Sequence, residues 1–204
     1  MDETIKVLVA DDHPLIRTGI RNILNRAPGI KVVGEAVDGE HVFRLVEQTK
    51  PDVLVLDMEM PTLTGVDVAR KLRSKGDSLP ILALSAHEDK QFIMGMLETG
   101  AAGYLVKDEV PETLVRAIRG VARGESGWVS QRIATRIAIW LQGEDHETMH
   151  LSKKEIRLLR LFLIGKSNQE IAEILQMDEA DVENCLRVVV KTVRHQFNHK
   201  PTHV

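Results

Sequence analysis

The stretch that decides the fold runs from Val53 to Pro61 and reads Val-Leu-Val-Leu-Asp-Met-Glu-Met-Pro. An unbroken apolar run followed by turn-forming residues is typical of a strand that is buried on both faces of a parallel sheet. This run ends at Asp57, and open α/β sheets bind their ligands at the carboxyl ends of their strands. Asp57 is therefore the first candidate functional residue.

A second acidic strand end lies upstream, where the apolar run Ile5 to Ala10 is followed by Asp11 and Asp12. A single Asp after a strand is often only a helix cap or a turn residue. If the two strands are neighbours, however, three carboxylates meet at one edge of the sheet. Carboxylates packed together repel one another and favour a hard divalent cation with oxygen ligands. The pattern predicts a Mg²⁺ site formed by Asp11, Asp12 and Asp57.

Two further strand ends carry groups that suit a phosphoryl group. The apolar run that begins at Ile81 ends in Ser85, and the run that begins at Gly103 ends in Lys107. The lysine and the metal would neutralise the phosphoryl charge, and the serine hydroxyl would donate a hydrogen bond to it. The same edge of the sheet is therefore expected to bind a phosphoryl group.

This order of strand ends resembles the receiver domain of two-component response regulators, from Ile5 to about Val121. The family pattern consists of an acidic pair, a phospho-accepting Asp, a Ser or Thr, an aromatic residue and a Lys. In this chain it falls on Asp11 and Asp12, Asp57, Ser85, Tyr104 and Lys107.

The resemblance implies a mechanism in which Asp57 attacks a phosphohistidine of a partner histidine kinase and becomes an acyl phosphate. It implies that Lys107 pairs with the phosphate, and that Ser85 and Tyr104 move together as a switch. It further implies a Mg²⁺ shell of Asp11, Asp57 and the backbone carbonyl of Glu59, with Asp12 as a direct or water-mediated ligand.

Glu59 and His87 lie beside the site in this pattern. Side chains at these positions can position or hinder the water that hydrolyses the acyl phosphate. A solvated surface role remains open for both residues.

The alternation of apolar runs and helical patterns predicts an α/β fold with a doubly wound, five-stranded parallel sheet of the flavodoxin type. Strands are expected at 5–10, 31–34, 53–57, 80–85 and 102–106. Helices are expected at 15–24, 40–48, 65–72, 90–99 and 112–123. Right-handed crossovers between the strands would bring all the functional strand ends to one edge.

Composition is consistent with a cytoplasmic regulator; that it is not an enzyme is expected from the resemblance to response regulators. The 204 residues suffice for two modest domains, and the net charge of -3 gives no overall basic excess for nucleic acid. The single cysteine, Cys185, excludes an internal disulfide framework and a cysteine-cluster metal site. The acidic N-terminus does not resemble a signal peptide, and no apolar run reaches membrane-spanning length.

The chain divides into a receiver domain at 1–123, a linker at 124–150 and an output domain at 151–204. A glycine-rich polar stretch, Arg123 to Gly127, follows the receiver. Apolar residues at helical spacing, from Ile133 to Leu141, predict a helix within the linker. This helix carries Trp140, and it packs either within its own chain or on another subunit. The acidic stretch from Gln142 to His150 is expected to be the flexible part of the linker.

The last segment resembles the helix-turn-helix output domain of LuxR-type response regulators. Ser152 and Glu155 form a capping-box signature, and Gly165-Lys166-Ser167-Asn168 separates the first two helices. Asp178 is expected to cap a third helix. The resemblance implies that this third helix lies in the DNA major groove. Its outward face would carry Glu183, Asn184, Arg187 and Lys191.

The third helix departs from the family pattern. Glu183 stands where Lys is common, and Cys185 stands where His is common. Carboxylates at the start of the helix stabilise it, but they also repel DNA phosphates; they are Asp178, Glu179 and Asp181. Residues 151–204 contain nine Lys or Arg and seven Asp or Glu, a net charge of only +2 for a DNA-binding module.

The chain stops at Val204, whereas family members usually continue into a fourth helix that is used in dimerisation. Either the sequence is truncated or the protein does without that element.

Three functions fit these observations. The main reading is a regulator that is phosphorylated by a histidine kinase, dimerises and controls transcription through DNA binding. The alternative is a receiver-controlled protein-interaction module whose helix-turn-helix no longer binds DNA. A metal-dependent phosphotransfer enzyme is disfavoured, because a dehalogenase-type phosphatase would have a second Asp at the position of Glu59. The cognate kinase, the target promoter and the sign of regulation are not encoded in any readable pattern.

Overall fold

The structure is a computed structural model, and it describes residues 4–86, 92–93, 95–96, 99–129, 133, 152–163, 166–182 and 184–185. The chain forms two compact units, Met1–Trp128 and Val129–Val204. None of the described helices is both long enough and apolar enough to cross a membrane.

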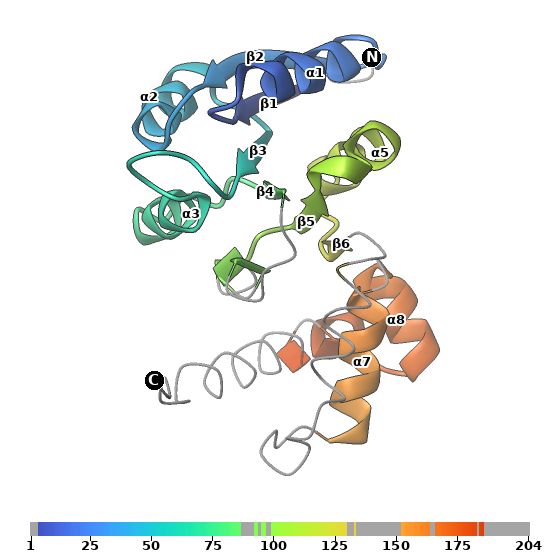
Figure 1. The fold of residues 1–204 in the computed structure, drawn as a ribbon. Helices are drawn as coiled ribbons and strands as arrows, with labels where there is room; N and C mark the ends of the chain where they lie inside the picture. Colours follow the sequence, from blue (N-terminus) through green and yellow to red (C-terminus); the bar gives the residue numbers. More distant parts are fainter. Residues whose placement is uncertain are drawn as a thin grey trace. The chain divides into compact units, whose positions relative to one another are not determined.

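The first unit is built on a parallel sheet whose strands lie in the order β2-β1-β3-β4-β5-β6 (Figure 1). The bounds are β1 Ile5–Ala10, β2 Ile30–Ala36, β3 Val53–Asp57, β4 Ile81–Ser85, β5 Gly103–Val106 and β6 Trp128–Val129. The pairings from β2 through to β5 are parallel. This is the flavodoxin-type order, which has its topological switch point between β1 and β3. The predicted fold class is confirmed, and within the described residues the sheet has a sixth, short strand.

Helices cover both faces of the sheet (Figure 1). One face carries α1 (Pro14–Asn25) and α5 (Val110–Ala122), and the other carries α2 (Gly39–Thr49) and α3 (Gly65–Ser74). A short 3₁₀ turn, η1 (Lys107–Glu109), joins β5 to α5. Of the helix predicted at 90–99, residues 92, 93, 95 and 96 are helical, and most of its other residues lie outside the described part of the chain.

The main apolar core lies between the sheet and the helices α1 and α5. Val7, Val9 and Val55 of the sheet pack there against Leu24 and Leu114 of the two helices. Because alternate residues of each central strand point to opposite faces, these strands are buried on both sides, as their unbroken apolar runs predict. The core therefore fixes the strand ends, which carry the candidate site.

The turn after β3 is held close to the strand end. The amide of Met58 donates to the carbonyl of Leu84 over 2.9 Å, and the amide of Gly65 donates to the carbonyl of Met58 over 3.1 Å. A Cβ added at Gly65 would collide with the carbonyl oxygen of Asp57 and the side chain of Met58. Glycine is therefore required for α3 to begin directly against the strand end that carries Asp57.

The second unit contains α7 (Lys153–Leu163) and α8 (Asn168–Leu175), followed by helical residues 179–182 and 184–185. The predicted capping box at Ser152 and Glu155 is confirmed, since the amide of Ser152 donates to Glu155 and the amide of Glu155 donates to Ser152. A second capping box, Ser167 with Glu170, starts α8. The buried apolar residues of the described part are Ile133, Leu158, Leu159, Phe162, Ile171, Ala172 and Val182. Trp140 and most of its predicted linker helix lie outside the described residues.

Candidate functional site

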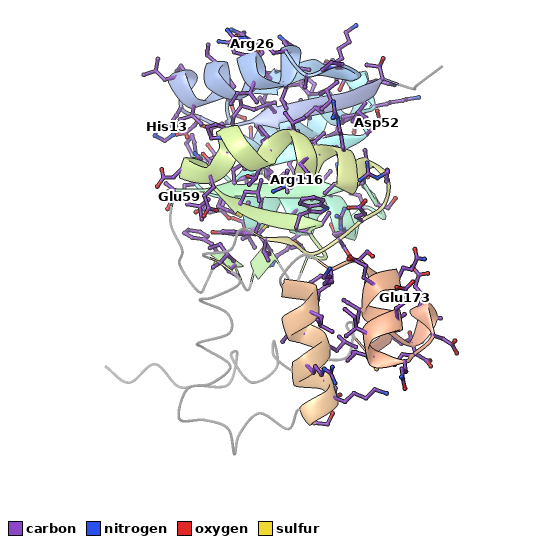
Figure 2. All side chains as sticks on the ribbon, turned by 90° about the vertical axis from the view of Figure 1, so that its right-hand side faces the viewer. His13, Arg26, Asp52, Glu59, Arg116 and Glu173 are labelled. Atoms are coloured by element: carbon purple, nitrogen blue, oxygen red, sulfur yellow. The ribbon has the colours of Figure 1, made fainter. Side chains whose placement is uncertain are left out.

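The candidate site lies at the carboxyl edge of the sheet, at the switch point between β1 and β3. Ala10 of β1 pairs with Leu56 of β3, so that Asp11 and Asp57 follow at the same level. Both of these residues are fully buried. Figure 2 shows His13 and Glu59, which follow the same two strands, at one edge of the receiver, with Asp52 at the opposite edge.

Lys107 bridges the two buried carboxylates. Its Nζ lies 2.7 Å from Oδ2 of Asp57 and 2.9 Å from Oδ2 of Asp11, and the lysine side chain is only 9% exposed. The parallel register explains how Lys107 reaches them: Ser85 pairs with Val106, which places Lys107 one residue beyond the end of β4. A buried ammonium between two carboxylates contributes to folding only while all three groups stay together.

The second oxygen of Asp57, Oδ1, accepts a hydrogen bond of 3.1 Å from the backbone amide of Glu59. Burial raises the pKa of Asp57, and Lys107 opposes that rise through its hydrogen bond and its charge. Burial lowers the pKa of Lys107, but Asp57 and Asp11 outweigh burial and raise it. An ion-paired carboxyl ordinarily has a lowered pKa; at Asp57 the effect of burial on the pKa outweighs that of Lys107.

The acidic cluster has the composition of a divalent-cation site. Asp11, Asp12, His13 and Asp57 each offer a ligand atom, and these atoms lie within 4.8 Å of one another. Nδ1 of His13 lies 2.7 Å from Oδ1 of Asp12, and the amide of His13 donates to Oδ1 of Asp11 over 2.8 Å. The donor set is mainly carboxylate oxygen, as Mg²⁺ prefers. Three carboxylates with one nearby ammonium leave excess negative charge, so the residues present fit a bound cation.

His13 is a member of this cluster that the sequence patterns did not select. It directly follows the acidic pair, and that position was the available signal. It was missed because the family pattern assigns no function to the residue there.

Of the other predicted receiver residues, Ser85 lies at this end of the sheet, whereas Tyr104 lies two residues before the end of β5, level with Ala83 of β4. Ser85 ends β4 and is fully buried, and Tyr104 in β5 is 3% exposed. Asp57, the last residue of β3, pairs with Leu84 of β4. Ser85 therefore lies one residue further along β4 than the level of Asp57. The structure thus brings Asp11 and Asp57 into contact with Lys107, places a ligand atom of Asp12 within 4.8 Å of those of Asp11 and Asp57, and places Ser85 at the same edge. His87 lies outside the described residues.

The predicted DNA-contact face is only partly described. Asn184 is helical and exposed, whereas Glu183, Arg187 and Lys191 lie outside the described residues. The carboxylates that begin this helix are exposed, which leaves their charge available to a partner; they are Asp178, Glu179 and Asp181.

Comparison with known proteins adds an independent line of observation. Residues 7–119 match the response regulator receiver domain. Residues 149–191 match the bacterial regulatory proteins of the luxR family.

Relatives match along nearly the whole chain. The chain is 32% identical to the uncharacterized transcriptional regulatory protein YxjL of Bacillus subtilis, over 95% of this chain and 91% of that protein. It is 33% identical to the nitrate/nitrite response regulator protein NarL of Escherichia coli, over 94% of this chain and 90% of that protein. The solved signal receiver domain of a NarL from Mycobacterium tuberculosis superposes with a TM-score of 0.58 and is 38% identical, covering 60% of this chain and 99% of that one.

Proposed function

The chain belongs to the LuxR family of bacterial response regulators, and on that premise we propose which residues carry its function. It joins a receiver domain to a LuxR-type DNA-binding domain, and its full-length relatives are transcription regulators. Its function is phosphorylation-switched control of transcription. The residue assignments below are proposals for this chain.

Asp57 is the proposed phosphoacceptor. The supporting observation is that Asp57 is buried at the switch point, with Lys107 on one carboxylate oxygen and the amide of Glu59 on the other. An oxygen of Asp57 forms a bond to phosphorus, while the bond from phosphorus to the kinase histidine nitrogen breaks. That nitrogen keeps the electron pair and takes up a proton from water. The receiver is left with an acyl phosphate.

The cation would be Mg²⁺, held by Asp11, Asp12 and Asp57 with the backbone carbonyl of Glu59. When bound, it neutralises charge on the transferred phosphoryl group. Lys107 loses one of its two carboxylate partners when Asp57 becomes an acyl phosphate, and its ammonium then pairs with the phosphate. Lys107, which contacts the unphosphorylated carboxylate of Asp57, therefore also contacts the phosphoryl group after transfer.

Ser85 and Tyr104 are the proposed switch. Both are buried: Ser85 ends β4, and Tyr104 lies on the neighbouring strand β5, two residues before its end. A new phosphate beside them changes the local charge and biases their arrangement. Ser85→Ala should still take up phosphate on Asp57 but show a weaker change in self-association. A full response by this variant would exclude Ser85 from the switch.

Output is proposed to be DNA binding by a phosphorylated homodimer, with Asn184, Arg187, Lys191 and Glu183 of the third helix as the contacts. The match of residues 149–191 to the luxR family supports this assignment. The exposed carboxylates Asp178, Glu179 and Asp181 favour the alternative, in which the same helix contacts a protein. The partner that donates the phosphoryl group is proposed to be a histidine kinase.

Phosphate uptake tests the receiver assignment. The wild type should be labelled stoichiometrically by acetyl phosphate with Mg²⁺ and should not be labelled after chelation. Asp57→Asn keeps the size of the side chain but removes the nucleophile, so labelling should vanish. Asp52→Asn is the matched control, because Asp52 lies at the opposite edge of the sheet (Figure 2). Stoichiometric labelling of Asp57→Asn would reject the assignment.

A titration against DNA separates the two outputs. Phosphorylated wild type should prefer genome-selected duplexes to random ones across a salt series. Glu183→Lys should raise nonspecific affinity and salt dependence, and it should lose about 1–3 kcal/mol of specificity if Glu183 reads a cytosine amino group. If no selected duplex binds better than random DNA, the protein-contact alternative replaces the DNA-binding assignment.

A further inference from the structure

We infer that Arg17 is a positioning residue for the cation site and that Glu35 holds it in place. The inference rests on the proposed function, because it concerns Asp11 and Asp12 as ligands. Nη1 of Arg17 donates to the backbone carbonyl of Asp11 over 2.7 Å, and its Nε lies 3.4 Å from Oε2 of Glu35. A single side chain thus connects the loop after β1 to strand β2.

Arg17 reaches this loop because of its place in α1. It lies in the first turn of the helix, where its amide donates to the carbonyl of His13. Side chains of a helix lean towards its N-terminus, so Arg17 extends back over the loop that precedes the helix. Its side chain is only 15% exposed. Water therefore competes little for its hydrogen bond to Asp11.

A register shift turns Glu35 towards α1. Val7 pairs with Val32, but the next residue, Leu8, pairs with Gly34, so Val33 is an extra residue in β2. Before the shift, Val32 packs into the core beside α1. After it, Gly34 faces α2, since an added Cβ would lie 3.6 Å from Leu45, and Glu35 faces α1. Without the register shift, Gly34 would face α1 and Glu35 would face α2.

The contact with the Asp11 carbonyl matters most for Asp12. Asp11 is already held by its amide, which donates to Ala36, and by its carboxylate, which contacts Lys107. The side chain of Asp12 is 30% exposed and contacts His13, and the peptide that joins Asp12 to Asp11 sets the direction in which this side chain leaves the loop. Arg17 holds the oxygen of that peptide. Residues that orient metal ligands in this way typically change metal affinity by about 10–100-fold when they are lost.

Arg21 provides a matched control within the same helix. It lies one turn beyond Arg17 and binds the same carboxylate, with Nη1 2.9 Å from Oε1 of Glu35. In the part of the chain that the structure describes, its side chain makes no hydrogen bond to the loop that carries Asp11. Loss of Arg21 therefore removes a similar charge from the same face without releasing the loop.

The test is calorimetric titration of full-length protein with Mg²⁺. Arg17→Gln should bind Mg²⁺ about 10-fold more weakly, whereas Arg21→Gln should bind it as the wild type does. The direction of the change in Mg²⁺ affinity decides the test. Removing the positive charge of Arg17 near three carboxylates would by electrostatics alone strengthen Mg²⁺ binding. The Mg²⁺ concentration for half-maximal uptake from acetyl phosphate should rise about 10-fold in parallel. Excess Mg²⁺ should restore most of the uptake.

A second variant with unchanged net charge keeps the test possible if Arg17→Gln does not fold. If Arg17→Gln does not fold, Arg17→Gln with Glu35→Gln removes both partners, leaves the net charge unchanged and should show the same weakening. Mg²⁺ affinity within twofold of the wild type in whichever of these variants folds would overturn the role of Arg17. If the wild type itself neither binds Mg²⁺ nor takes up phosphate, the proposed function fails instead.

Discussion

The carboxylates of the receiver and those of the output domain occupy opposite environments. Asp11 and Asp57 are fully buried beside Lys107, and burial raises the pKa of Asp57. Glu170, at the start of α8, has a side chain that is 46% exposed, and its pKa is lowered by the hydrogen bonds that it accepts from Lys166 and from the amide of Ser167. The ionised carboxylate therefore disfavours the fold at Asp57 and stabilises the start of a helix at Glu170. We therefore propose that Asp11 and Asp57 serve the chemistry of the site and that Glu170 serves helix formation.

The largest effect should come from removing the receiver ammonium. Lys107→Ala leaves Asp11 and Asp57 buried without their cation, which should cost about 3–5 kcal/mol of unfolding free energy without Mg²⁺. Added Mg²⁺ should recover part of this loss, because the metal replaces the missing positive charge. Urea unfolding followed by tryptophan fluorescence measures both values. Lys31→Ala, at an exposed position of the edge strand β2, is the control and should change little. Equal stability of Lys107→Ala and wild type would contradict the interpretation that the ionised carboxylate of Asp57 disfavours the fold.

A smaller effect of opposite sign is expected from Asp57→Asn. The folded pKa of Asp57 is raised above its ordinary value of 3.8, so the ionised form disfavours the fold. This penalty is absent below the pKa of Asp57 in the unfolded chain. It grows as the pH rises towards the pKa of Asp57 in the folded protein and is complete above it. Without Mg²⁺, Asp57→Asn should therefore be more stable than the wild type at pH 7, by about 0.5–2 kcal/mol.

Thermal unfolding of the two proteins between pH 4 and pH 7 checks this prediction. The advantage of the variant should shrink towards pH 4, where more of the wild-type Asp57 is protonated. An advantage that is constant with pH would point to packing rather than to the charge of Asp57.

The smallest effect is expected at the output domain. Glu170 has a folded pKa below its ordinary value of 4.5, so its contribution is present above that pH and is lost as the pH falls through the folded pKa. Glu170→Gln should speed amide hydrogen exchange at the start of α8 at pH 7 and make little difference at low pH. Glu173→Gln, in the same helix but outside the capping box, is the control. Equal exchange in the two variants would show that the charge of Glu170 does not support the helix.

The bounds of a strand were predicted better where the sequence pattern of that strand was unbroken. β3 was predicted with its observed bounds, because an unbroken apolar run marks a strand that is buried on both faces. β2 was predicted as 31–34 but extends from Ile30 to Ala36. The extra residue Val33 interrupts the alternation on which a strand prediction depends.

The short strand β6 had no local signal at all. Its two residues are too few to show a period, and they are held by tertiary contacts. The amide of Trp128 donates to Ala102 over 3.1 Å. Its indole lies where a Cβ on Gly120 would be, so the glycine leaves room for it. The first compact unit accordingly extends to Trp128, five residues beyond the end of the predicted receiver at 123.

The sequence by itself determined the order of the strand ends and the chemical groups they carry, because hydrophobic period and turn residues are properties of neighbouring positions. Only the tertiary structure decided which of these groups meet. Lys107 contacts Asp57 across 50 residues of chain because the sheet order brings β3, β4 and β5 side by side. Glu35 meets Arg17 because a register shift reverses the face to which it points. Such contacts depend on pairing between distant segments, which no local pattern records.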